Sequence, residues 1–164
     1  MKKFLILITI ISFAFILQAQ AQKTGSTGST GSNYRTAVGA KIYFSDGTTG
    51  GINIKHFLNR TAALEGSLLF STGVLGVEGL YEYHGDIAGA PGLKYYVGAG
   101  GIIAFSTDKN SSEDVAFGIR STIGLDYKIS GTPIDLAFDL DPTFTLAPAT
   151  SFDFGAGLAF RFAF

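Results

Sequence analysis

Two histidines are the residues of this 164-residue chain that could most readily do acid–base chemistry. They are His56 and His84, and neither lies in a serine motif that would supply a nucleophile. We interpret His56 as an interfacial side chain and His84 as a histidine of a turn. The chain contains no cysteine, so a cysteine nucleophile and thiolate metal sites are excluded. The sequence therefore predicts no catalytic residue.

Four aspartates close to the C-terminus could supply oxygen ligands to a hard cation. They are Asp135, Asp139, Asp141 and Asp153. Three basic residues lie in the same part of the sequence: Arg120, Lys128 and Arg161. Salt bridges between these two sets are the simpler expectation, because unpaired buried charges are costly. We therefore predict neither a metal site nor a cofactor site.

The composition of the chain limits which kinds of molecule the protein could bind and which environment it could occupy. The formal net charge is −1, which argues against nucleic acid as a partner. Charged residues make up 15% of the chain, below the roughly 25% that is usual for soluble domains. Aromatic residues make up 13%, which excludes intrinsic disorder.

The first 33 residues read as a targeting segment and a linker. Residues 1–21 have a basic start, an apolar run and an Ala19-Gln20-Ala21 end, which together predict a cleaved secretory signal peptide. Residues 22–33 form a Thr-Gly-Ser tract without apolar side chains, which predicts a flexible linker. The folded domain should therefore span residues 34–164.

From residue 34 onward, apolar and polar residues alternate with a period of two, which is typical of β-strands. Short clusters of Gly, Asp, Asn and Ser separate the runs, as in a series of hairpins. The predicted strands are 34–44, 51–58, 61–71, 74–84, 93–105, 115–129, 133–144 and 151–164. Pro142 cannot donate to a strand ladder, so we expect it at a rim or a bulge.

The charged residues of each predicted strand share one face. In the first strand Tyr34 and Val38 lie on the apolar face, opposite Arg35 and Lys41. The charged face also carries many glycines, and its basic and acidic residues nearly balance. Small residues and balanced charges suit a narrow interior, whereas the bulky aromatic face suits lipid. We therefore predict an all-β, closed, up-and-down antiparallel transmembrane barrel of eight strands.

Three segments carry a resemblance to a known family: HFLNRTAALEGSLLF, GLYEYHGDIAGAPGLKYYVGAGG and IGLDYKISGTPIDLAFDLDPTF. They resemble the small outer-membrane β-barrel proteins of Gram-negative bacteria, with an OmpA- or OmpX-like architecture. The end of the chain, with Phe160, Phe162 and Phe164, looks like the C-terminal signal that the outer-membrane assembly machinery reads. The resemblance implies an outer-membrane location, lipid as surroundings and this machinery as a partner.

The expected function is a non-enzymatic outer-membrane barrel with a structural or interaction role, and we expect a monomer. Some barrels of this architecture modify lipid A with a His, a Ser and an acid, but His56 and His84 lie in separate hairpins. The alternative is a barrel that binds or transports a small ligand, which an ordered ligand in the interior would support. A soluble lipocalin-like barrel needs an apolar interior, contrary to the charge pattern. In the interior we expect cross-strand ion pairs, with Arg120 and Arg161 reaching acids such as Asp139, Asp153 and Glu65.

Overall fold

The protein forms a closed antiparallel barrel in the computed structural model, which describes residues 34–107 and 115–164. Its eight strands are β1 (Thr36–Phe44), β2 (Thr48–Phe57), β3 (Ala62–Ser71), β4 (Val74–Asp86), β5 (Leu93–Ser106), β6 (Val115–Lys128), β7 (Ile134–Ala147) and β8 (Ser151–Ala163). The predicted signal peptide and linker lie outside the described residues. Within the described residues, no helix is long and apolar enough to span a membrane.

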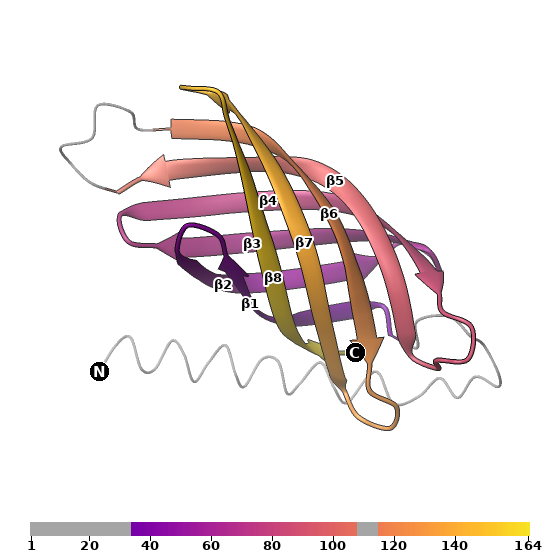
Figure 1. The fold of residues 1–164 in the computed structure, drawn as a ribbon. Coiled ribbons are helices and arrows are strands. Elements are labelled where there is room, and N and C mark those ends of the chain that lie inside the picture. The colour runs from indigo at the N-terminus through magenta and orange to yellow at the C-terminus, as the bar shows by residue number, and fades with distance from the viewer. Residues whose placement is uncertain (1–33, 108–114) are drawn as a thin grey trace, which may run out of the picture. The chain divides into compact units, whose positions relative to one another are not determined.

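Closure comes from the pairing of the first and last strands. Each strand pairs with the next one along the chain, as Figure 1 shows. β8 then pairs with β1 from Ala37 opposite Ala163 to Phe44 opposite Ala156. Every strand therefore has two neighbours, and the barrel leaves no free sheet edge. The prediction of an eight-stranded up-and-down barrel is confirmed.

The two ends of the barrel carry different connections. One end, here the terminal end, holds Tyr34 and Ala163 together with the turns at 58–61, 87–92 and 129–133. The other, here the loop end, holds the turns at 45–47, 72–73 and 148–150, the end of β5 and the start of β6. The β3–β4 turn has only two residues between its strands, and Gly73 there has φ +72°, which favours glycine.

The strands differ in length around the wall. β1, β2 and β3 have 9, 10 and 10 residues, whereas β5, β6 and β7 each have 14. The ordering and the faces of the strands agree with the prediction, but several limits move outward. β2 begins at Thr48 rather than at residue 51, and β7 continues to Ala147.

The start of β1 corrects the predicted faces. Arg35 lies in a bend before β1, where its side chain is exposed, and Tyr34 is buried. The prediction had placed Tyr34 toward lipid and Arg35 inside. It was wrong because the bend reverses the alternation, so a period-two pattern from β1 does not extend across it.

Pro142 lies within β7, opposite Phe154 of β8. On the other side of β7, the β6 pairing runs to Arg120 opposite Thr143 and resumes at Ile123 opposite Leu140. The register irregularity of this pair falls elsewhere, between Phe117 and Gly118. The expected rim or bulge position for Pro142 was therefore wrong: it lies within β7, where the pairing with β6 is interrupted at Asp141 and Pro142 because proline has no N–H to donate.

The outer surface of the barrel is an apolar belt with aromatic residues at both ends. Outward tyrosines gather toward the terminal end: Tyr81, Tyr83, Tyr95 and Tyr127. Most outward phenylalanines lie toward the loop end, whereas Phe138, Phe160 and Phe162 lie nearer the terminal end; those toward the loop end are Phe44, Phe70, Phe105, Phe117, Phe144, Phe152 and Phe154. Aliphatic side chains fill the zone between them, with Ile123 55% exposed. Aromatic girdles around an apolar band are typical of barrels that cross a membrane.

Candidate functional site

The interior of the barrel is filled by polar and charged side chains. The strand alternation turns them inward, and the largest charged or polar ones without any exposed surface include Lys41, Lys55, Glu82, Asn53, Asp135, Asp139 and Arg161. Glycines make the room: a Cβ at Gly124 would lie 2.6 Å from the Tyr96 ring, and one at Gly98 would lie 3.0 Å from Glu82. The lumen is therefore packed with ion pairs, as the sequence predicted.

Arg161 of β8 is the centre of this network. Its guanidinium donates to Glu65 at 2.7 Å, to Asp135 at 2.9 Å and to the Asn53 carbonyl oxygen at 2.5 Å. The three partners come from β3, β7 and β2, so one side chain ties together four strands. The predicted pair with Glu65 is confirmed.

Lys55 forms a second centre toward the terminal end. Its ammonium nitrogen lies 2.9 Å from Glu82, 3.0 Å from Asp126 and 3.2 Å from Glu65. It also sits 4.2 Å from the centre of the Tyr96 ring, a cation–π arrangement. All of these groups are buried, so the attraction between them acts with little screening by water.

His84 belongs to this second centre. Its Nε2 lies 3.4 Å from Asp126 and 3.5 Å from Glu82, and its ring stacks on Tyr96 at 5.0 Å. The side chain is fully buried. The interpretation as a turn histidine was wrong, because β4 continues past it to Asp86 and turns its ring into the lumen. Its surroundings are those of a packed ion-pair cluster.

His56 lies on the outer side of β2, as predicted. Its Nδ1 is 2.9 Å from the hydroxyl of Thr36 on the neighbouring strand. This cross-strand hydrogen bond gives the Nδ1 atom of His56 a partner on β1.

Lys41 links the centre of the network to the loop end. Its ammonium lies 2.8 Å from Glu65 and 3.1 Å from Asp139. The hydroxyl of Tyr96 donates to the same Asp139 at 2.5 Å. Asp139 is therefore paired with a lysine and a tyrosine rather than with Arg120 or Arg161, the partners that the sequence suggested.

Arg120 closes the network toward the loop end. Its Nη1 donates to Glu78 at 2.5 Å and its Nε to the Thr143 hydroxyl at 2.8 Å. The Tyr43 hydroxyl donates to the same Glu78 at 2.6 Å. The expected contacts of Arg120 with Asp139 and Asp153 were wrong, because Glu78 faces it at this level and Asp153 lies at the exposed start of β8.

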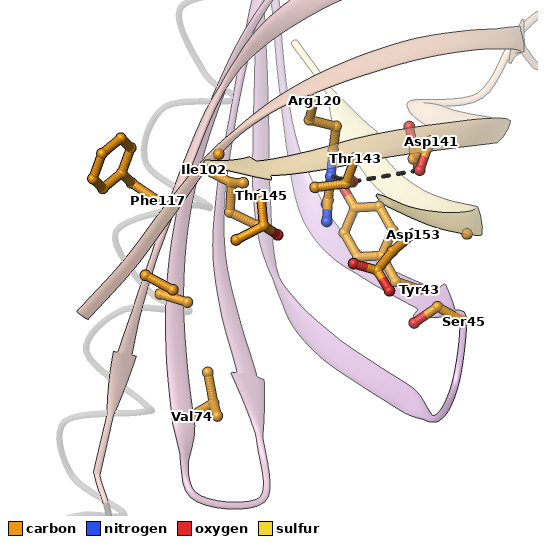
Figure 2. Close-up of a pocket in the computed structure, with 14 residues that line it drawn as sticks. Tyr43, Ser45, Val74, Ile102, Phe117, Arg120, Asp141, Thr143, Thr145 and Asp153 are labelled. Carbon is orange, nitrogen blue, oxygen red and sulfur yellow. Dashed lines mark hydrogen bonds between the residues drawn. The ribbon is translucent and has the colours of Figure 1, made fainter. Parts of the chain in front are cut away.

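Above Arg120 a vestibule of about 390 Å³ opens at the loop end. Figure 2 shows Tyr43, Arg120, Thr143, Asp141 and Asp153 grouped around it. Phe117, which belongs to the outer surface, points away from this group. The vestibule has room for a small molecule or ion.

Inward aromatic residues are the part of this site that the sequence reasoning missed. Tyr34, Tyr43, Phe57 and Tyr96 are all buried in the barrel. Three of them lie two positions from a charged residue of the same strand, such as Tyr43 from Lys41 and Phe57 from Lys55. Residues two apart in a strand share a face, so this spacing could have predicted that these aromatic side chains point inward. Tyr34 donates to Asp135 at 3.0 Å. Burial, followed by the charges of Asp126 and Asp135, raises the pKa of this phenol, so it stays a neutral donor.

The described residues bring no three His, Cys, Asp or Glu side chains into an arrangement that could hold a metal ion. Of the four aspartates considered for a cation, Asp139 and Asp141 are neighbours on the inner face of β7, whereas Asp135 and Asp153 lie elsewhere. Asp135 pairs with Arg161, Asp139 with Lys41, and Asp153 accepts from Ser151 at the exposed rim. Asp141 remains at the floor of the vestibule.

No protein-family profile matches the sequence. No curated protein matches it either. Among solved structures, the chain is similar to the N-terminal β-barrel domain of Pseudomonas aeruginosa OprF, with a TM-score of 0.62 and 21% identity over 79% of this chain and 98% of that one. It is also similar to Neisserial surface protein A, with a TM-score of 0.50 and 16% identity over 80% of this chain and 96% of that one.

The chain has the fold of these small barrels. A closed barrel with an apolar exterior, aromatic girdles and a polar interior is the architecture of outer-membrane proteins. The polar face points inward and the apolar face outward, which is the opposite of the soluble lipocalin-like barrel that the charge pattern already disfavoured.

Proposed function

We propose that this protein resides in the outer membrane as a non-enzymatic monomeric barrel with a structural or interaction role. The observation that supports it most is the fully buried ion-pair network around Arg161, Lys55 and Glu65. Such a network joins strands across the lumen and leaves no space for a permeating solute at its level. His84, the buried histidine best suited to acid–base chemistry, contacts Asp126 within this network.

Ion conductance tests this proposal directly. Purified protein, refolded and heat-modifiable on a gel, is reconstituted into planar lipid bilayers. We expect no discrete channel openings, because charged side chains fill the lumen. The matched control is Arg161→Ala, which removes the side chain that ties four strands together and should permit small openings. Stable channels in the unaltered protein would contradict the proposal and favour a transport role.

A barrel that binds a small ligand is the second candidate. The vestibule of about 390 Å³ favours it, since its volume falls in the range of small-molecule pockets. Equilibrium dialysis against small polar solutes, with and without a bulky substitution such as Ala104→Phe on the vestibule wall, tests this alternative. Binding that Ala104→Phe abolishes would support a ligand-binding barrel.

A further inference from the structure

The inner wall of the barrel changes character toward the loop end. The middle of the lumen holds the buried ion pairs, whereas the inward residues of β4, β5 and β6 at the vestibule include four apolar ones: Val74, Ile102, Ala104 and Ala116. Val74 is 40% exposed although it lines the vestibule, and the other three are half-buried. Within the described part of the chain, this apolar surface therefore faces open space rather than packed side chains.

The strand register joins these residues into one surface. Ala104 lies opposite Gly76 of β4 on one side and opposite Ala116 of β6 on the other. A second hollow of about 150 Å³ continues the same surface toward Leu69 of β3. Because apolar area in contact with water is favourably covered by another apolar group, this wall fits the apolar body of a small molecule.

The remaining wall of the vestibule is polar. It is formed by β7, β8 and the β1–β2 turn, through Thr143, Thr145, Asp153 and Ser45. Thr143 lies directly opposite Asp153 in the β7–β8 register. Figure 2 shows Asp153 and Ser45 set apart from Val74. The vestibule thus has an apolar side and a hydrogen-bonding side, which suits an amphipathic ligand.

Asp153 is the charged group that a ligand entering the vestibule meets. Its side chain is exposed and accepts a hydrogen bond from Ser151 at 3.2 Å, but no basic side chain lies within 4 Å of it among the described residues. Arg120, which also lines the vestibule, is balanced by Glu78 at 2.5 Å. The oxygens of Asp141 are buried. The accessible charge of the vestibule is therefore negative, which attracts a cation.

We propose that the vestibule binds a small organic cation, an amine whose apolar body lies on Val74, Ile102 and Ala104 and whose ammonium group contacts Asp153. The apolar contact supplies affinity, and the charge-assisted hydrogen bond to the carboxylate fixes the orientation. This inference rests on the second candidate function, the ligand-binding barrel, and names the chemical class of its ligand.

Three probes of similar size and different charge test the ligand class. They are 2-phenylethylamine, which is cationic at neutral pH, the neutral 2-phenylethanol and the anionic phenylacetate. Binding to the refolded protein is measured by equilibrium dialysis in an uncharged maltoside detergent. Protein-free detergent gives the baseline, because the probes also enter micelles. We expect the amine to bind about tenfold more tightly than the alcohol, since a hydrogen bond between charged groups is the stronger one, and the acid not to bind.

Two variants locate the charge that the amine contacts. Asp153→Asn keeps the shape and removes the charge, so the amine should fall to the affinity of the alcohol while the alcohol binds as before. The matched control is Asp46→Asn in the β1–β2 turn, an exposed acid at the same end of the barrel that does not line the vestibule. It should change the affinity for the amine less than about twofold, because salt screens a distant exposed charge. Ala104→Phe should abolish binding of the amine and of the alcohol.

The outcomes separate the alternatives once heat-modifiability has shown that each variant forms its barrel. Equal binding of the three probes, or unchanged amine affinity in Asp153→Asn, would overturn the ligand class. If Ala104→Phe still abolished that binding, the ligand-binding barrel itself would stand. An equal loss in Asp153→Asn and Asp46→Asn would reveal only a general negative field, and would also overturn the proposal.

Two further results would count against it. Amine binding that appears only in Lys109→Gln would mean that a lysine of the chain itself, outside the described residues, takes the place of the ligand. No binding of any probe would likewise overturn the inference, whereas the second candidate function is decided separately by the polar solutes and the proposed structural role by conductance.

Discussion

Arg161 is the residue whose loss should weaken the barrel most. Arg161→Met keeps most of the apolar stem but leaves Glu65, Asp135 and Asn53 without their donor in a buried site. We expect the free energy of unfolding to fall by about 3–5 kcal/mol. Urea unfolding in lipid vesicles, followed by circular dichroism, measures it.

The control for this change is Arg35→Met. Arg35 is exposed in the bend before β1, so its replacement should alter stability by less than about 0.5 kcal/mol. Equal losses in the two variants would contradict a special role for the buried guanidinium.

Gly124 makes room for the ring of Tyr96. The substitution Gly124→Ala would push the added methyl against that ring and against the Phe138 carbonyl oxygen, both 2.6 Å away. We expect a loss of about 1–3 kcal/mol, as in other overpacked sites. Gly101→Ala on the outward side of β5 is the matched change, because its nearest neighbour would lie at 3.8 Å. The same unfolding measurement should show no loss for Gly101→Ala, and a loss in both would refute the packing argument.

Single residues also show how far the sequence could predict the interior. Lys41, Lys55, Glu65 and Arg161 could be assigned to the lumen, because charge and period two both point there. Their partners could not, because pairing across the lumen depends on the stagger of strands that are distant in the chain. Arg120 meets Glu78 of β4 for this reason. That Asp141 has no basic side chain within 4 Å in the described part of the chain could not be predicted either, because a count of charges gives no distances.

At the scale of the strand, β8 should be the element on which assembly depends. It pairs with β7 and closes the barrel on β1, and Phe154, Phe160 and Phe162 are exposed on its outer face. We expect deletion of Phe164, the residue after β8, to reduce the amount of heat-modifiable, membrane-inserted protein severalfold. The reasons are the aromatic interface of this strand and the resemblance of its end to an assembly signal.

A serine-to-alanine change at Ser111 is the control, because the polar segment 106–114 should tolerate substitution. The amount of inserted protein is compared between the two variants in the same cells. If both insert equally well, the terminal aromatic residue is not an assembly signal in this chain.

The strands themselves could be predicted because each carries a run of period-two alternation bounded by turn residues. Their limits could not, because hydrogen bonding continues past the point where the pattern ends. β2 begins among Thr48, Thr49 and Gly50, which have no apolar alternation but pair with Phe44, Tyr43 and Ile42. The bend at Arg35 is the opposite case: the alternation of apolar and polar residues extends back to Tyr34, but the strand begins only after Arg35.

For the whole molecule, the arrangement of faces predicts how the protein behaves outside lipid. An apolar belt of exposed Ile, Leu, Val and Phe side chains should require detergent for solubility. In cell fractionation we expect the protein with the outer membrane, and on gels we expect a shift in mobility on heating. Recovery of a soluble monomer without detergent would reverse the assignment of inside and outside.

The unequal strands have a consequence for the surrounding lipid. Strands of about 9–11 residues span a bilayer when they are tilted, so β1, β2 and β3 are just long enough, while β5, β6 and β7 extend beyond it. The hydrophobic height thus varies around the circumference. A barrel of this kind leans, or thins the bilayer beside its short wall. The bilayer should therefore be thinner beside β1–β3 than beside β5–β7. The membrane around the protein would then differ in thickness from one side of the barrel to the other.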